Sequence, residues 1–109
     1  MKEPTLGNPQ NTIAVLQKYN FIFQKKFGQN FLIDTHVLDK IIRAAEIGKD
    51  DLVLEIGPGI GTMTQYLSCA AGKGIAEEID RALIPILEDT LDGYDNVRVI
   101  NEDVLKVDI

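Results

Sequence analysis

The stretch Glu55-Ile56-Gly57-Pro58-Gly59-Ile60-Gly61 contains the residues whose types and spacing point most clearly to chemistry. It follows a short apolar run and opens a segment with helical spacing, which predicts a strand, a tight turn and a helix start. Glycine lets the backbone turn sharply and approach a ligand where a Cβ would be in the way. The helix would point its free N–H groups and its positive dipole end at the occupant of the turn. This arrangement is typical of sites for nucleoside-bearing cofactors.

A second acidic residue could complete such a site. Glu78 follows the next expected strand, and a carboxylate there can accept hydrogen bonds from both hydroxyls of a ribose. The spacing E-x-G-x-G-x-G differs from the GxGxxG of dinucleotide sites and favours S-adenosylmethionine. Glu77 and Asp80 are acidic too, so a solvated acidic edge is the alternative interpretation of Glu78. We expect Glu55 to orient the glycine turn through backbone N–H groups and not to bind the ligand.

The surrounding pattern predicts the elements that must position these residues. Strands are expected at 52–56, 74–76 and 97–100, the first of them buried and continuously apolar, with helices at 62–71 and 81–91 between them. Two further helices, at 8–18 and from about residue 34 to Gly48, precede the strands. The order β-α-β-α-β is half of a doubly wound, Rossmann-like α/β sheet. Because three strands are few for such a fold, we expect the chain to be the front part of a longer protein.

Helical spacing also predicts which side chains face the core. We expect one inward stripe on each of the four helices. In chain order these stripes are Ile13 and Leu16; Val37, Leu38, Ile41, Ile42 and Ala45; Met63, Tyr66, Leu67 and Ala70; and Leu83, Ile84, Leu87 and Leu91.

Composition narrows the class of protein. The chain has 109 residues, a net charge of −6 and one cysteine, and it shows neither a signal peptide nor an apolar run long enough to span a membrane. We therefore expect one small cytoplasmic domain with no metal site, because no His/Cys/Asp cluster has ligand spacing. Residues 1–34 carry +2 and the remainder −8. Lys25 and Lys26 stand among aromatic residues and could contact RNA, or the segment could be a solvated arm whose aromatics pack on the core.

Several motifs together resemble the ribosomal RNA adenine dimethyltransferases. They are Phe27-Gly28-Gln29-Asn30-Phe31-Leu32-Ile33-Asp34, the stretch from Glu55 to Thr64, Glu78-Ile79-Asp80, and Asn101-Glu102-Asp103-Val104-Leu105. The resemblance covers the chain from about residue 20 and is strongest to the bacterial small-subunit branch, whose relatives are the macrolide-resistance methylases of large-subunit RNA. It implies a methyltransferase fold of Rossmann-like type, with 1–34 as an N-terminal helix and basic, aromatic loop and 35–109 as the first half of the S-adenosylmethionine-binding domain.

The resemblance also implies an activity and a set of site residues. The family transfers methyl groups from S-adenosylmethionine to N6 of adenine, and the bacterial enzyme dimethylates two adjacent adenines of 16S RNA. Asn30 and Leu32 are expected to line the cofactor pocket, and Asp103 to accept a hydrogen bond from the adenine amino group of the cofactor. The glycine turn is expected to approach the methionine part by backbone and Glu78 to hold the ribose; the glycines are Gly57, Gly59 and Gly61. Outside the motifs, Asn30 would be a turn residue and Asp103 a helix cap.

Two departures from the family pattern qualify these expectations. The catalytic Asn-Leu-Pro-Tyr element does not occur in the 109 residues, and the helical domain that helps to grip RNA is missing. We therefore expect the chain to bind cofactor without transferring methyl groups, since no residue would hold the target amine in line. Gly74 weakens the second strand, and Glu77 stands where the family usually has a bulky apolar residue. Exposed sheet edges could pair with a second copy of the chain.

Three alternatives remain open at this stage. A large-subunit methylase of the macrolide-resistance type would share the chemistry and differ in its RNA. A non-catalytic ribosome assembly factor would use the same fold only to bind RNA. A nicotinamide-dependent enzyme is disfavoured, because the chain lacks a GxGxxG and has Pro58 within the glycine turn.

Overall fold

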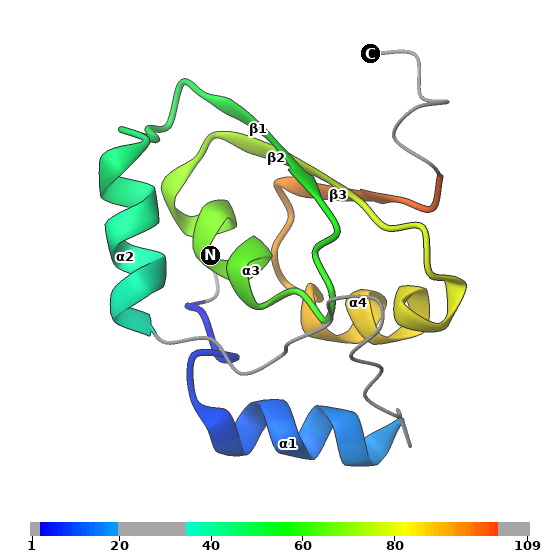
Figure 1. The fold of residues 1–109 in the computed structure, drawn as a ribbon. Coiled ribbons are helices and arrows are strands. Elements are labelled where there is room, and N and C mark those ends of the chain that lie inside the picture. Colours follow the sequence, from blue (N-terminus) through cyan, green and yellow to red (C-terminus); the bar gives the residue numbers. More distant parts are fainter. Residues whose placement is uncertain (1–2, 20–34, 103–109) are drawn as a thin grey trace.

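The computed structural model describes residues 3–19 and 35–102, which form a three-stranded sheet and the helices packed around it (Figure 1). In chain order the elements are α1 (Pro9–Lys18), α2 (Thr35–Ala44), β1 (Leu52–Ile56), α3 (Thr62–Ala70), β2 (Lys73–Glu77), the 3₁₀ turn η2 (Arg81–Leu83), α4 (Ile84–Thr90) and β3 (Val97–Ile100). The predicted β-α-β-α-β order is confirmed. Within the two described stretches, every helix is too short or too polar to cross a membrane.

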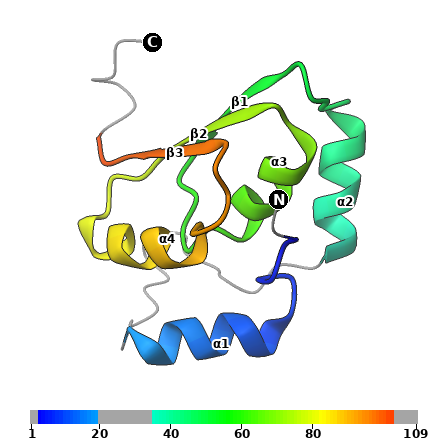
Figure 2. The same ribbon diagram turned by 180° about the vertical axis from the view of Figure 1, so that it is seen from behind.

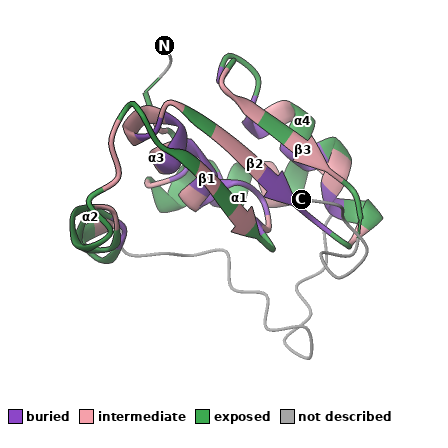
Figure 3. Ribbon diagram, turned by 90° about the horizontal axis from the view of Figure 1, so that it is seen from above, coloured by how far each residue is buried: buried purple, intermediate pink, exposed green. Residues whose placement is uncertain are grey.

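The strands are parallel and lie in the order β1-β2-β3, with β1 at one edge. Helices α3 and α4 cover one face of the sheet (Figure 3). On the other face, alternate residues of β1 stay exposed: Leu52 by 65%, Leu54 by 40% and Ile56 by 61%. The prediction that this strand is buried throughout is therefore wrong for the described residues, because none of their elements covers its second face.

The covered face holds two apolar clusters. One joins Leu87, Leu91 and Tyr94 to β3. The other joins Leu6 and Ile60 to Leu83 and Ile86, with side chains of α1 packed against it. Residues 3–19 are thus an integral layer beneath α4, as the view from behind shows (Figure 2).

The residues of α3 that are buried differ from the predicted stripe, and most of them are polar. Leu67 is buried as expected, but Met63, Tyr66 and Ala70 are only partly buried. The other buried positions are Thr62, Thr64, Gln65 and Ser68. Three of these find hydrogen-bond partners outside the helix, which removes most of the cost of burying them.

Two of the other helices also differ in detail from prediction. In α1, Ile13 is 46% exposed and Thr12 is buried, since the Thr12 hydroxyl donates to the Leu6 carbonyl at 3.1 Å. Helix α2 ends at Ala44 and not at Gly48, and Glu46 adopts a left-handed φ of 53° beyond it. Only Leu38 of the predicted α2 stripe is buried, because among the described elements this helix packs mainly beside α3.

The segment after β2 agrees more closely with prediction. It begins as η2 and continues as α4, with Pro85 in the first turn, where proline is tolerated. The predicted stripe residues of this segment are buried, except for the half-buried Ile84, and Ile86 is an additional core residue.

Candidate functional site

The turn between β1 and α3 has the left-handed backbone that its glycines allow. Gly57, Gly59 and Gly61 have φ values of 72°, 63° and 97°, a region that residues with a Cβ rarely adopt. The turn is closed by a bond from the Gly61 N–H to the Pro58 carbonyl (3.0 Å). The Gly57 N–H donates to the Glu77 carbonyl at 2.8 Å, which ties the start of the turn to the end of β2.

The turn has one open side and one packed side. A Cβ built on Gly57 would meet no described atom within 4 Å. A Cβ on Gly61 would lie 2.9 Å from Thr90 Oγ1 and 3.2 Å from Leu87 Cδ2. The packed side therefore rests on α4, and no described residue fills the open side.

Glu78 lies directly beside the glycine turn. Its side chain, in a residue only 5% exposed, accepts from the Gly59 N–H at Oε1 (3.1 Å) and from the Asp80 N–H at Oε2 (3.0 Å). The Glu78 backbone is held as well, because its carbonyl accepts from Asn101 Nδ2 (2.7 Å) and its N–H donates to the Ile100 carbonyl (2.9 Å). The structure thus brings the predicted ribose ligand and the glycine turn together at the carboxyl edge of the sheet.

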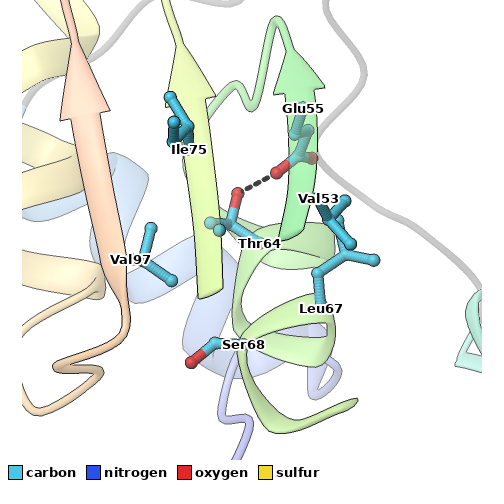
Figure 4. Close-up of a pocket in the computed structure, with 8 residues that line it drawn as sticks. Val53, Glu55, Thr64, Leu67, Ser68, Ile75 and Val97 are labelled. Carbon is cyan, nitrogen blue, oxygen red and sulfur yellow. Dashed lines mark hydrogen bonds between the residues drawn. The ribbon is translucent and has the colours of Figure 1, made fainter. Parts of the chain in front are cut away.

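Glu55 does not orient the glycine turn, and that prediction is wrong. Its side chain points toward α3, where a carboxylate oxygen accepts from the Thr64 hydroxyl at 2.5 Å (Figure 4). Burial raises the pKa of Glu55 above its ordinary value, the Thr64 hydrogen bond opposes this rise, and the negative charge of Glu78 adds to it. Among the described residues it is the Glu78 carboxylate, and not that of Glu55, that accepts from a glycine of the turn.

The space beside Glu55 is too small to be a cofactor site. It lies between α3 and the sheet, is lined by side chains such as Val53, Leu67 and Val97, and has a volume of about 10 Å³ (Figure 4). Such a volume holds about one water molecule. A nucleoside-sized ligand therefore cannot bind in this space.

Several predicted site residues lie outside the described residues: Asn30, Leu32 and Asp103, and the candidate RNA contacts Lys25 and Lys26. Among residues 3–19 and 35–102, acidic, histidine and cysteine side chains form no group of three that could hold a metal ion.

Two supporting residues escaped the sequence reasoning. Asn101 follows β3 as Glu78 follows β2, and a polar residue just after a parallel strand is a signal that could have found it. Thr90 donates its hydroxyl to the Ile60 carbonyl at 2.7 Å and so holds the middle of the glycine turn. Nothing in the spacing of the sequence connects Thr90 with Ile60. The two residues meet because α4 packs against the glycine turn.

Comparison with known proteins assigns this arrangement to a family. A sequence model of the family described as ribosomal RNA adenine dimethylase matches residues 20–109. The chain belongs to the ribosomal RNA adenine dimethylase family. The resemblance seen in the motifs is confirmed, and with it the Rossmann-like fold class of S-adenosylmethionine-dependent methyltransferases.

Individual relatives agree with the family. A ribosomal RNA small subunit methyltransferase A from Lachnoclostridium phytofermentans is 75% identical over 105 residues, which are 95% of this chain and 36% of that protein. A dimethyladenosine transferase structure from Plasmodium falciparum is 39% identical, with a TM-score of 0.62 over 68% of this chain and 28% of its own. The 23S rRNA methyltransferase ErmE is 38% identical, with a TM-score of 0.67 over 73% of this chain and 33% of its own. The chain thus spans about a third of the length of the relatives it matches.

Proposed function

We propose that this chain is the cofactor-binding part of an RNA adenine N6-dimethyltransferase that methylates two adjacent adenines of 16S ribosomal RNA in the cytoplasm. The observation that carries the proposal is the 3.1 Å contact between the Glu78 carboxylate and the Gly59 N–H. It places a nearly buried carboxylate beside a turn whose open side has room for a ligand. The family membership supplies the reaction class, and the small-subunit relatives favour 16S RNA.

The cofactor, S-adenosylmethionine, would supply an electrophilic methyl group on its sulfonium. Glu78 is the proposed acceptor for the ribose hydroxyls, and its bonds to the Asp80 N–H and Asn101 hold it in place before binding. The open side of Gly57 gives the methionine part access to the backbone. Asn30 and Leu32, with Asp103 for the adenine amino group, complete the proposed pocket.

The chain alone should bind cofactor without transferring a methyl group. Transfer needs the adenine N6 in line with the sulfonium methyl, and positioning of this kind supplies a large share of catalysis. The family element that does this, Asn-Leu-Pro-Tyr, does not occur in these 109 residues. Lys25 and Lys26 are proposed to meet the RNA backbone.

A chimaera tests the activity. The 109 residues are joined to the part of the L. phytofermentans relative that follows the matched region. Over the matched 105 residues this relative is 75% identical to the chain. With tritiated cofactor, the chimaera should form dimethyladenosine in unmethylated small-subunit RNA, and the separate chain should not. The same chimaera with Glu78→Ala should be inactive, whereas Glu88→Ala, which removes an exposed acid of α4, should be active.

The alternatives predict different results in this assay. The macrolide-resistance type, to which the likeness with ErmE also points, is tested with a second chimaera that carries the corresponding part of ErmE. Activity of that chimaera on large-subunit RNA, with no activity of the first on small-subunit RNA, would favour it. RNA binding without methyl transfer by the chimaera would favour a non-catalytic assembly factor. Dimethyladenosine formed by the 109 residues alone would refute the proposed division of labour.

We further propose that the 109-residue chain by itself associates with a second copy through β1. This edge strand has no described neighbour on one side, and Leu52 and Ile56 are each more than half exposed on its open face. Unpaired strand edges with apolar faces are templates for pairing with another chain. Light scattering should show a dimer or larger species that Leu52→Lys shifts toward monomer. A monomeric wild-type chain at the same concentration would refute this proposal.

A further inference from the structure

We infer that residues 3–19 act as a positioning element that holds the glycine turn in its cofactor-binding conformation. The identity of the ligand rests on the proposed function, whereas the contacts of residues 3–19 with the turn do not. The family model matches residues 20–109, so residues 3–19 lie outside the match. The structure nevertheless places them against the packed side of the glycine turn, which lies about 40 or more residues later in the sequence.

Gln65 fixes the first part of this segment to the methyltransferase core. Its side-chain oxygen accepts from the N–H groups of Thr5 and Leu6, both at 2.9 Å, and its side-chain nitrogen donates to the Thr90 carbonyl at 2.8 Å. Gln65 is 1% exposed, so these bonds form out of competition with water. The Tyr94 hydroxyl adds a bond to the Glu3 carbonyl at 2.6 Å. The segment is therefore fixed to α3, to α4 and to the turn that precedes β3.

This anchorage brings Leu6 into one cluster with Ile60. Leu6 is 3% exposed and Ile60 1% exposed. The half-buried Val15, Leu16 and Tyr19, at the end of α1, pack against the same cluster. Ile60 stands between Gly59 and Gly61, so its side chain is the apolar anchor of the glycine turn. The segment supplies one wall of the pocket that receives this anchor.

Anchorage matters here because the turn is rich in glycine. A glycine-rich turn has many accessible conformations. Molecules whose turn is in a conformation that cannot bind cofactor do not contribute to binding, so the apparent affinity falls in proportion to the competent fraction. Thr90 holds the Ile60 carbonyl, and among the described residues the apolar cluster holds the Ile60 side chain. The Glu78 carboxylate has one bond to the turn, from the Gly59 N–H, whereas the bonds of Glu78 to the Asp80 N–H and Asn101 involve neither the turn nor the segment.

The two ends of the cofactor should therefore respond differently when the segment is loosened. Leu6→Ala removes the side chain packed near Ile60 and leaves the bonds of Glu78 to the Asp80 N–H and Asn101 in place. The affinity for S-adenosylmethionine should fall about tenfold, as expected if the competent turn drops to a tenth of the population. The affinity for adenosine, which lacks the methionine part, should fall by less than about twofold on the same reasoning. A loss of folded protein would weaken both ligands equally.

The experiment compares four versions of the 109-residue chain: wild type, Leu6→Ala, the repacking variant Leu6→Met, and Ile13→Ala as a matched control. Ile13 lies on the same segment but is 46% exposed and outside the cluster. Both ligands are titrated by calorimetry at a temperature where all four are folded. Amide hydrogen exchange of residues 57–61 is measured without ligand, where Leu6→Ala should speed exchange at Gly61 about tenfold. Leu6→Met and Ile13→Ala should match wild type.

Each outcome decides the matter. Equal losses for the two ligands, or unchanged exchange at Gly61 in Leu6→Ala, would overturn the inference and leave the segment a purely structural role. Wild-type protein that binds neither ligand would overturn the proposed function, and the exchange data would still decide whether residues 3–19 hold the turn. If Leu6→Ala does not fold, Leu16→Ala, half-buried in the same cluster, takes its place with the same expected split.

Discussion

Adding one methyl group to either end of the glycine turn should separate stability from cofactor binding. Gly61 has a φ of 97°, and its Cβ would lie 2.9 Å from Thr90 Oγ1 and 3.2 Å from Leu87 Cδ2. A left-handed conformation costs a residue with a Cβ about 1–2 kcal/mol, and overpacking adds about 1–3 kcal/mol. Gly61→Ala should therefore lower the free energy of unfolding by about 2–5 kcal/mol, a large share of the stability of a small domain.

Gly57→Ala is the matched comparison. Its φ of 72° carries the same conformational cost, but no described atom lies within 4 Å of the added Cβ. Gly57→Ala should therefore cost only about 1–2 kcal/mol of stability. If the methionine part of the cofactor binds on this open side, the methyl group crowds it by about 1–3 kcal/mol, or roughly 5- to 150-fold in affinity.

Urea unfolding followed by circular dichroism measures the first quantity, and calorimetric titration with S-adenosylmethionine measures the second. The reasoning is refuted if Gly57→Ala destabilises the fold as much as Gly61→Ala, because the turn then lacks the open and packed sides described above. It is equally refuted if Gly57→Ala binds cofactor as the wild type does.

Three further substitutions test the interior, each by urea unfolding. Gly74→Ala should stabilise the fold by about 0.4–1 kcal/mol, since its Cβ would make ordinary contacts with Val97 and Val53, the nearest at 3.6 Å; a loss of stability would contradict this. Glu77→Val should raise the free energy of unfolding by about 1–3 kcal/mol, because Glu77 is 3% exposed and its Oε2 has no described hydrogen-bond partner. A destabilised variant would show that this carboxylate is paired. Because the pKa of Glu55 is raised, mainly by burial, the folded state holds its proton more tightly and stability is lost as pH rises from the ordinary carboxyl range through the raised pKa. Glu55→Gln should remove that loss, and an unchanged pH profile would exclude this assignment.

The backbone was largely predictable from the sequence. Strands at 52–56 and 97–100 have the predicted bounds, because short β-rich apolar runs between turn residues leave few other solutions. Strand β2 begins one residue earlier than predicted, at Lys73, where pairing with Leu52 extends the ladder. The glycine turn and Glu78 meet as the parallel order requires, since the carboxyl ends of neighbouring strands share one edge.

The faces of the helices were less predictable, and the reason is long-range hydrogen bonding. Gln65 is buried because its partners lie about sixty residues away, at Thr5 and Leu6. Glu55 was expected to accept from the N–H groups of the glycine turn, but Glu78 does so. The spacing of the sequence alone does not show which of the two carboxylates reaches the turn. The cofactor roles of the site residues and the division at residue 34 remain predictions.

The most direct test of the central claim is calorimetric titration of S-adenosylmethionine into wild type, Glu78→Ala and the exposed-acid control Glu88→Ala. Wild type and Glu88→Ala should bind saturably, and Glu78→Ala should bind more than about a hundredfold more weakly, because two hydrogen bonds to a charged group are lost. NAD should not bind any of the three. Undiminished binding by Glu78→Ala, or saturable binding of NAD in place of S-adenosylmethionine, would contradict the account.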